Sequence, residues 1–198
     1  MTKTKRSVLT AVCIALCVVL PMAVHAVPNA GQIFLPMHIP VLLAGLCCGW
    51  PFGLLAGVAG PLLSSLFTSM PPLAYLPSML CELALYGLLS GAFSSRLRSG
   101  RLVVDLYLSL IAAMLLGRVA AGLLQAALFS AGNYSLAIWA AAYFVQGLPG
   151  IVIQLLLLPP LVMALEHARL IPRRYPRRMA AATEPDSVEE QVQAETRA

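Results

Sequence analysis

Two ionisable side chains, Glu82 and Arg118, interrupt stretches of the sequence that are otherwise apolar. An ionised group surrounded by hydrocarbon costs several kcal/mol, so such groups normally face protein or water and have a partner. One interpretation is therefore a structural ion pair that fixes the register of two helices. The other is a binding site, because a guanidinium group can hold a ligand carboxylate through two parallel hydrogen bonds.

Further polar residues favour the binding site, because an ion pair alone would not need them. Tyr86 follows Glu82 by one helical turn and shares its face, and Gln125 shares the face of Arg118 two turns further on. The candidate substrate-binding residues are His38, Glu82, Tyr86, Arg118, Gln125 and Gln154.

His38 is the weakest of these candidates. It lies between two prolines in the segment FLPMHIPVLLAG, at the start of an apolar run. The residues alone fit a loop histidine with an internal hydrogen bond as well as they fit a ligand contact. Our hypothesis is that the two prolines fix the end of a loop so that the imidazole faces the ligand.

The sequence holds no arrangement typical of an enzyme. It contains no Ser/His/Asp set, no HExxH motif and no Walker-type glycine loop, so a partner would have to supply the energy for active transport. The cysteines lie within apolar segments without the spacing of metal ligands, at Cys13, Cys17, Cys47, Cys48 and Cys81. We expect them to be small buried hydrophobic residues, and we predict no metal site and no cofactor.

The elements that must position the polar groups are helices in a membrane. The chain is 60% hydrophobic and 11% charged, with a mean hydropathy of +0.85, whereas a soluble domain is about a quarter charged. A spanning helix needs about 20 apolar residues. The sequence therefore predicts an all-α integral membrane protein with six spans, at about 7–27, 39–48, 52–68, 78–95, 102–130 and 148–167.

Outside these spans, two segments have a different composition. Residues 131–146 are partly amphipathic, and we expect them to form a cap on the outer surface. Residues 1–170 would form the membrane domain, and 171–198 a basic, then acidic, disordered cytoplasmic tail.

The positive charges predict the orientation of the spans. Lys and Arg occur before the first span, between the fourth and fifth, and after the last, but not in segments 28–37, 69–77 and 131–146. Because cytoplasmic loops collect Lys and Arg, both termini are predicted to be cytoplasmic. The net charge of +5 then reflects topology rather than binding to nucleic acid.

The first apolar stretch has a second interpretation. Residues 1–26 have a basic start, an apolar centre and an Ala-Val-His-Ala ending, which is typical of a cleavable signal peptide. Charge bias cannot separate the two, because cleavage would leave every later loop on the same side of the membrane. The residues alone leave both possibilities open.

In this topology the polar groups lie in the outer half of the membrane. At a rise of about 1.5 Å per residue, Glu82 lies roughly 7 Å below the outer surface and Arg118 roughly 18 Å, a gap that a long arginine side chain can narrow. Gln154 lies at about the depth of Glu82. Three helices begin on this side, so their positive dipole ends favour an anion. We predict an outward-facing pocket for a small ligand that carries a carboxylate.

The segment FLPMHIPVLLAGLCCGWPFGLLAGVAGPLLSSLFTSMPPLAYLPSMLCELALYGLLSG resembles substrate-binding S components of energy-coupling-factor (ECF) vitamin transporters. The later LLGRVAAGL and GLPGIVIQLLLLPPLVMALE fit the same pattern, so the resemblance covers roughly 7–166. It implies a six-helix subunit in the plasma membrane of a prokaryote that binds a vitamin from outside. It also implies a separate transmembrane coupling subunit and two ATPase subunits, which drive release by tipping the S component over in the membrane.

The resemblance also bears on the start of the chain and on the ligand. The first helix of the family carries an AxxxA motif that docks the coupling subunit, and Ala11 and Ala15 match it, which favours a retained first span. Pantothenate is the favoured vitamin, because it has a carboxylate for Arg118 and hydroxyl and amide groups for the other polar residues. Folate would need more aromatic surface, and riboflavin lacks a carboxylate.

Two other functions remain open on the residues alone. A non-transporting membrane scaffold, such as the rod-shape proteins of similar size and span count, would have no reason to gather these polar groups at one depth. An intramembrane hydrolase using Glu82 and His38 would need a second activating group or a metal, and none occurs at a usable spacing.

Overall fold

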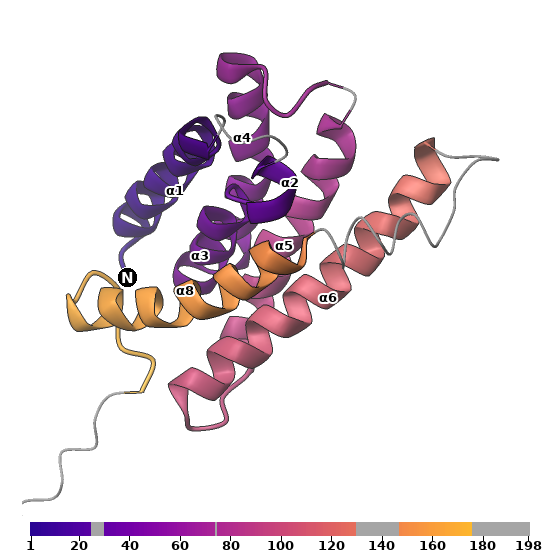
Figure 1. Cartoon of the computed structure of the whole chain (residues 1–198). Coiled ribbons are helices and arrows are strands. Elements are labelled where there is room, and N and C mark those ends of the chain that lie inside the picture. The colour runs from indigo at the N-terminus through magenta and orange to yellow at the C-terminus, as the bar shows by residue number, and fades with distance from the viewer. Residues whose placement is uncertain (25–29, 74, 130–146, 176–198) are drawn as a thin grey trace, which may run out of the picture.

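The computed structural model describes residues 1–24, 30–73, 75–129 and 147–175, and within them every regular element is a helix (Figure 1). The all-α fold class is therefore confirmed. In chain order the helices are α1 (Lys3–Val24), α2 (Ala30–Phe34), α3 (His38–Cys48), α4 (Trp50–Thr68), α5 (Leu76–Arg96), α6 (Leu102–Phe129) and α8 (Leu148–His167).

Five of these helices, α1, α4, α5, α6 and α8, are long and apolar enough to cross a membrane. The segment predicted at 39–48 forms α3, which has 11 residues and is therefore only about 16 Å long. This is about half of the length that a span needs. The described part of the chain thus contains five candidate spans and one shorter apolar helix where the sequence predicted six spans.

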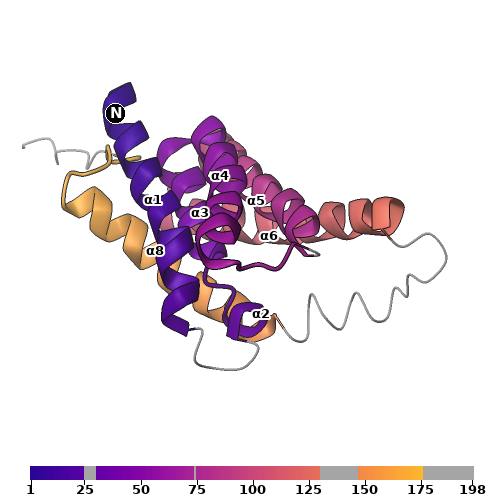
Figure 2. The ribbon, with the colours of Figure 1, turned by 90° about the horizontal axis from the view of Figure 1, so that it is seen from above.

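The short helix α3 lies at the centre of the bundle. It packs against α1, α4, α5 and α8 (Figure 2). Nine of its 11 residues are buried. The reason lies in its sequence, HIPVLLAGLCC, which has no polar face. A helix that is apolar on all sides is stable when other helices cover it. Gly49, with φ of 94°, then turns the chain directly into α4.

Helices α3, α4 and α5 approach so closely that only glycine fits at their contacts. A Cβ atom at Gly53 would overlap the carbonyl oxygen of Gly87, and one at Gly87 would overlap the carbonyl oxygen of Gly53. A Cβ at Gly45 would in turn overlap the hydroxyl of Ser90 on α5. Small residues one turn apart permit such close packing of helices in lipid. The contact fixes α5, which carries two of the predicted site residues, against α3.

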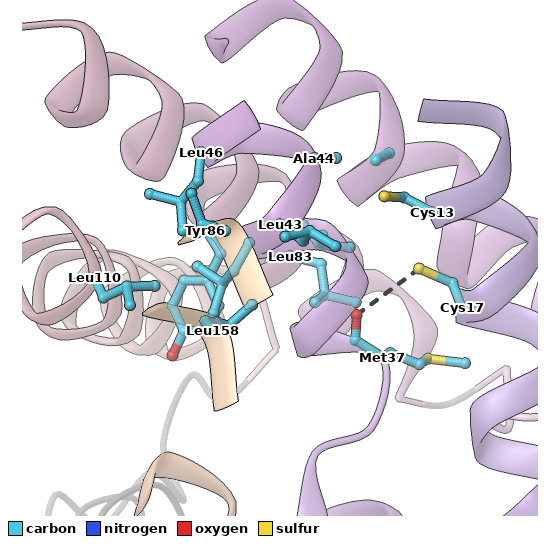
Figure 3. Packing of buried hydrophobic residues seen from close by; sticks show 14 of the residues in the cluster. Cys13, Cys17, Met37, Leu43, Ala44, Leu46, Leu83, Tyr86, Leu110 and Leu158 are labelled. Atoms are coloured by element: carbon cyan, nitrogen blue, oxygen red, sulfur yellow. Dashed lines mark hydrogen bonds between the residues drawn. The ribbon is translucent and has the colours of Figure 1, made fainter. Parts of the chain in front are cut away.

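Helix α1 covers α3 and α4 with one face. Cys13 and Cys17 on this face are buried, and the Cys17 thiol donates a hydrogen bond to the Met37 carbonyl at 3.7 Å (Figure 3). A Cβ at Gly60 on α4 would lie 2.8 Å from the Cys17 sulfur. These cysteines behave as the small buried residues that the sequence predicted.

One short segment differs from the sequence-based expectations. The loop expected at 28–37 contains the five-residue helix α2, which packs against the start of α8. A Cβ at Gly150 would lie 2.8 Å from the carbonyl oxygen of Ile33. At the other end, Ile171 packs against the bundle after α8, close to the boundary predicted at 170.

Candidate functional site

Glu82 and Tyr86 lie one turn apart in the first half of α5, and both are buried in the bundle. The exposed fraction is 8% for Glu82 and 0% for Tyr86. Figure 3 shows the Tyr86 ring packed among the apolar side chains of the core, with its hydroxyl at the edge of that layer. A carboxyl group in such surroundings needs a polar partner, because burial of a lone charge is costly.

His38 at the start of α3 provides that partner. Its Nε2 lies 3.5 Å from Oε1 of Glu82, and its ring meets the Tyr86 ring edge-on with 5.2 Å between centroids. A turn places it there: Leu35 has a left-handed φ of 49°, and its carbonyl accepts the His38 N–H at 3.1 Å. Within the described residues, neither ring nitrogen of His38 has a hydrogen-bond partner that meets normal geometry.

Arg118 joins this group from α6. Its Nε donates a hydrogen bond to the Tyr86 hydroxyl at 2.7 Å, and the side chain is buried. The adjacent Gly117 makes the approach possible, since a Cβ there would overlap the Tyr86 ring. Gly117 was not among the residues predicted from the sequence. The only signal in the sequence was its position next to the buried arginine in LLGRVAAGL.

Gln154 is a further buried polar residue, on α8. It lies on the buried face of α8 between Gly150 and Leu158, one turn from each. Its exposed fraction is 0%, and within the described residues neither its amide nitrogen nor its amide oxygen has a hydrogen-bond partner. A buried amide with both atoms unsatisfied is uncommon in native proteins and requires an explanation.

The structure therefore brings His38, Glu82, Tyr86 and Arg118 into one polar cluster. Glu82 pairs with His38, and Arg118 is linked to this pair through Tyr86. Tyr86 lies one turn further along α5 than Glu82, and in this position it joins Arg118 to the pair. The side chain of Gln125 lies outside the described residues.

The comparison with known families decides what kind of protein holds this cluster. A family model described as ECF transporter, substrate-specific component, matches residues 5–162, which include the whole polar cluster and Gln154. The chain belongs to this family. Searches among curated proteins and solved structures gave no significant match.

Membership in the family confirms the resemblance seen in the sequence at the level of the family. A substrate-specific component of an ECF transporter is a multi-pass membrane protein, which agrees with the five long apolar helices. It is a transporter subunit rather than an enzyme, it binds a small-molecule substrate, and it works with the coupling and ATPase components of an ECF module.

In this substrate-specific component the polar cluster is enclosed. Glu82, at 8%, has the largest exposed fraction of its four side chains. Binding of a molecule to these side chains would therefore require the residues around them to move. The described residues contain no group of three or more His, Cys, Asp or Glu side chains placed to hold a metal ion.

Ala11 and Ala15, the residues that match the AxxxA motif, lie on the exposed face of α1. The opposite face carries Cys13 and Cys17, which pack into the bundle. The two alanines are one turn apart, so together they form a flat strip on the outside of the helix. Such a strip would let another helix approach closely.

Proposed function

We propose that this chain is the high-affinity substrate-binding subunit of an ECF-type vitamin uptake transporter. It captures a small vitamin with a carboxylate group, pantothenate by preference, from outside the cell. The observation that carries this proposal is the polar cluster, together with the unsatisfied amide of Gln154, inside the bundle of a family member. A ligand that supplies hydrogen-bond partners to Gln154 would account for these unsatisfied buried atoms.

The chemistry of the cluster indicates the kind of ligand. The Nε–H of Arg118 points at Tyr86, which fixes the plane of the guanidinium group. A fixed guanidinium plane suits a carboxylate, since the two groups match in geometry and charge. The guanidinium of Arg118 is the group in the cluster whose charge and shape match an added carboxylate.

The remaining polar atoms favour pantothenate over other vitamins. Gln154 offers an amide donor and an amide acceptor, which match the amide of pantothenate. Glu82 and His38 can accept and donate hydrogen bonds to its hydroxyl groups. Tyr86 is the aromatic residue of the cluster, and its ring packs edge-on against His38, which leaves less stacking surface than a folate or flavin ring system would use.

The positions of the other charges support an orientation with both termini in the cytoplasm. The start of α1, the α5–α6 loop and the segment after α8 all carry Lys or Arg. In bacterial membrane proteins such residues gather on the cytoplasmic side. In this orientation the chain lies in the plasma membrane of a prokaryote and α1 is retained, with Ala11 and Ala15 facing the transmembrane coupling subunit.

The test of the proposed function is a titration of the purified protein with pantothenate. Wild type should bind it, and Arg118→Ala should lose about 2 kcal/mol or more of binding free energy, because a charged hydrogen bond in a desolvated site is lost. This corresponds to roughly a 30-fold weaker affinity. Arg98→Gln, at an exposed arginine in the α5–α6 loop, is the matched control and should bind like wild type.

Two outcomes of this titration would contradict the proposal. Equal affinity of wild type and Arg118→Ala would make Arg118 a structural residue only. Absence of binding of pantothenate and of other carboxylate-bearing vitamins, without any gain of thermal stability, would contradict the proposed substrate class.

A further inference from the structure

A second site lies at the end of the bundle where the basic residues gather. A cleft with a volume of about 730 Å³ separates the start of α1 from the segment that follows α8. Its lining includes Lys5 from α1 and Arg169 and Arg173 from the segment after α8. We call this the basic cleft. None of its residues belongs to the polar cluster described above.

The charges of the basic cleft favour an anion. Three of the side chains that line the cleft are cationic, Lys5, Arg169 and Arg173, and one is a carboxylate, Glu166. The net charge of these side chains is therefore +2. Glu166 is itself engaged, because its Oε1 accepts the backbone N–H of Arg174 at 3.2 Å. The three cations are exposed, so their charged groups are free to meet a ligand at the mouth of the cleft.

The wall of the cleft is fixed to the bundle, although it follows the last helix. Arg174 donates a hydrogen bond from Nη2 to the Ser94 hydroxyl of α5, and Tyr175 donates one to Asp105 of α6. The Tyr175 oxygen also accepts the N–H of Gly100 at 3.1 Å. The hydrogen bond to Asp105 raises the pKa of Tyr175, so the hydroxyl stays protonated and this anchor persists at neutral pH.

The backbone at Arg169 gives a second indication. Arg169 lies two residues after α8 in the left-handed conformation, with φ of 58°, and Leu170 N–H bonds back to the Leu165 carbonyl at 3.0 Å. Glycine is the usual residue at this position, since a Cβ is strained there. An arginine at a position that favours glycine indicates that its side chain has a use of its own.

The cleft also has an apolar side. Leu170, with an exposed fraction of 57%, and the buried Ile171 line it beside the cationic groups. It lies where two apolar helices end, which is the level of the phospholipid headgroups in a bilayer. A ligand with a phosphate and an adjoining hydrocarbon chain would match both sides of the cleft.

We propose that the basic cleft binds the phosphate headgroup of an anionic phospholipid. Lys5, Arg169 and Arg173 surround the phosphate, and the first part of an acyl chain lies against Leu170. Clusters of Lys and Arg at the ends of membrane helices bind anionic headgroups in this way. The bound lipid would tie the start of α1 to the end of α8.

Native mass spectrometry of the intact protein tests this proposal. Wild type is released from detergent after mixing with equal amounts of phosphatidylglycerol and phosphatidylcholine. Wild type should retain phosphatidylglycerol in preference to phosphatidylcholine. Arg169→Gly and Arg173→Gln should each reduce that retention about fivefold, the effect of one cation near an anionic headgroup.

The variants are chosen so that a loss of fold cannot imitate the result. Arg169→Gly relieves the left-handed strain, so its thermal stability without lipid should equal or exceed that of wild type. Arg98→Gln removes the same charge outside the cleft and should retain phosphatidylglycerol like wild type. Equal losses in Arg98→Gln and Arg169→Gly would overturn the site, because net charge alone would then explain binding.

A competition experiment distinguishes a bound lipid from a bound free anion. Millimolar inorganic phosphate should leave the bound phosphatidylglycerol in place, because the acyl chain adds contacts that phosphate lacks. Displacement by inorganic phosphate would overturn the lipid as the occupant. Vitamin binding is measured in the same variants and should not change, so failure of this proposal is distinct from failure of the proposed function.

Discussion

Arg118 is held inside an apolar bundle by a tyrosine, and the pair could not be read from the sequence. The hydroxyl of Tyr86 accepts the Nε–H of Arg118 at 2.7 Å, and Gly117 leaves room for the tyrosine ring. The polar candidates themselves could be found from sequence, because ionisable residues in apolar stretches are rare. Their pairing could not, since it depends on how closely α5 and α6 cross.

Replacement of Tyr86 by phenylalanine tests this pair. The Phe ring should still pack against Gly117, but the Arg118 Nε–H would lose its buried acceptor. We expect the free energy of unfolding to fall by about 2 kcal/mol, the usual size for a hydrogen bond to a charged group. Chemical denaturation in detergent measures it. Tyr75→Phe, at a tyrosine with 59% exposure, should change little, and equal stability of Tyr86→Phe and wild type would contradict this account.

The prediction of His38 as a contact of the site rested on its position between two prolines. In the structure it opens α3 beside Glu82, 3.5 Å away, and its neighbour Pro40 is buried in the first turn of that helix. Its role toward a ligand remains a prediction. Gln154 was found from its depth alone, and the structure adds that its amide is buried without a partner among the described residues.

At the scale of the elements, most helix boundaries could be predicted from the positions of proline and glycine in the sequence. Pro51 and Pro149 start α4 and α8 at the positions where proline suits the first turn, and Gly49 separates α3 from α4. The apolar sequence of α3 did not show whether it crosses the membrane, because a fully apolar helix of 11 residues can instead be buried in protein. The helix α2 was not predicted, because five residues are too few to show a helical pattern of apolar positions.

The glycine contact between α4 and α5 is the element-scale feature most open to test. In Gly87→Ala the new methyl group would overlap the backbone carbonyl of Gly53, so the two helices must separate. We expect a loss of at least about 2 kcal/mol in the free energy of unfolding, as for other over-packed contacts.

Gly31→Ala is the matched control for that substitution, because no atom lies within 4 Å of the added Cβ. It should leave the midpoint of thermal unfolding unchanged or slightly higher, since alanine favours the helix. If the two alanine variants unfold at the same temperature, the close contact does not stabilise the bundle.

At the scale of the whole molecule, the charged residues occur in two different surroundings. One end of the bundle carries the exposed Lys and Arg residues and the basic cleft, whereas the polar cluster lies inside the protein where α5, α6 and the start of α3 meet. Composition predicted the membrane protein and charge bias predicted which loops share a side. The family match from residue 5 to 162 then identifies a substrate-specific subunit of a transporter.

The most direct measurement is mass spectrometry of small molecules released from the purified protein on denaturation. The account predicts one dominant molecule that carries a carboxylate, with pantothenate as the expected species. It should be present in near-stoichiometric amount in wild type and in Arg98→Gln, and strongly depleted in Arg118→Ala. A molecule without a carboxylate, or the same amount in wild type and Arg118→Ala, would contradict the claim that the polar cluster is the substrate site.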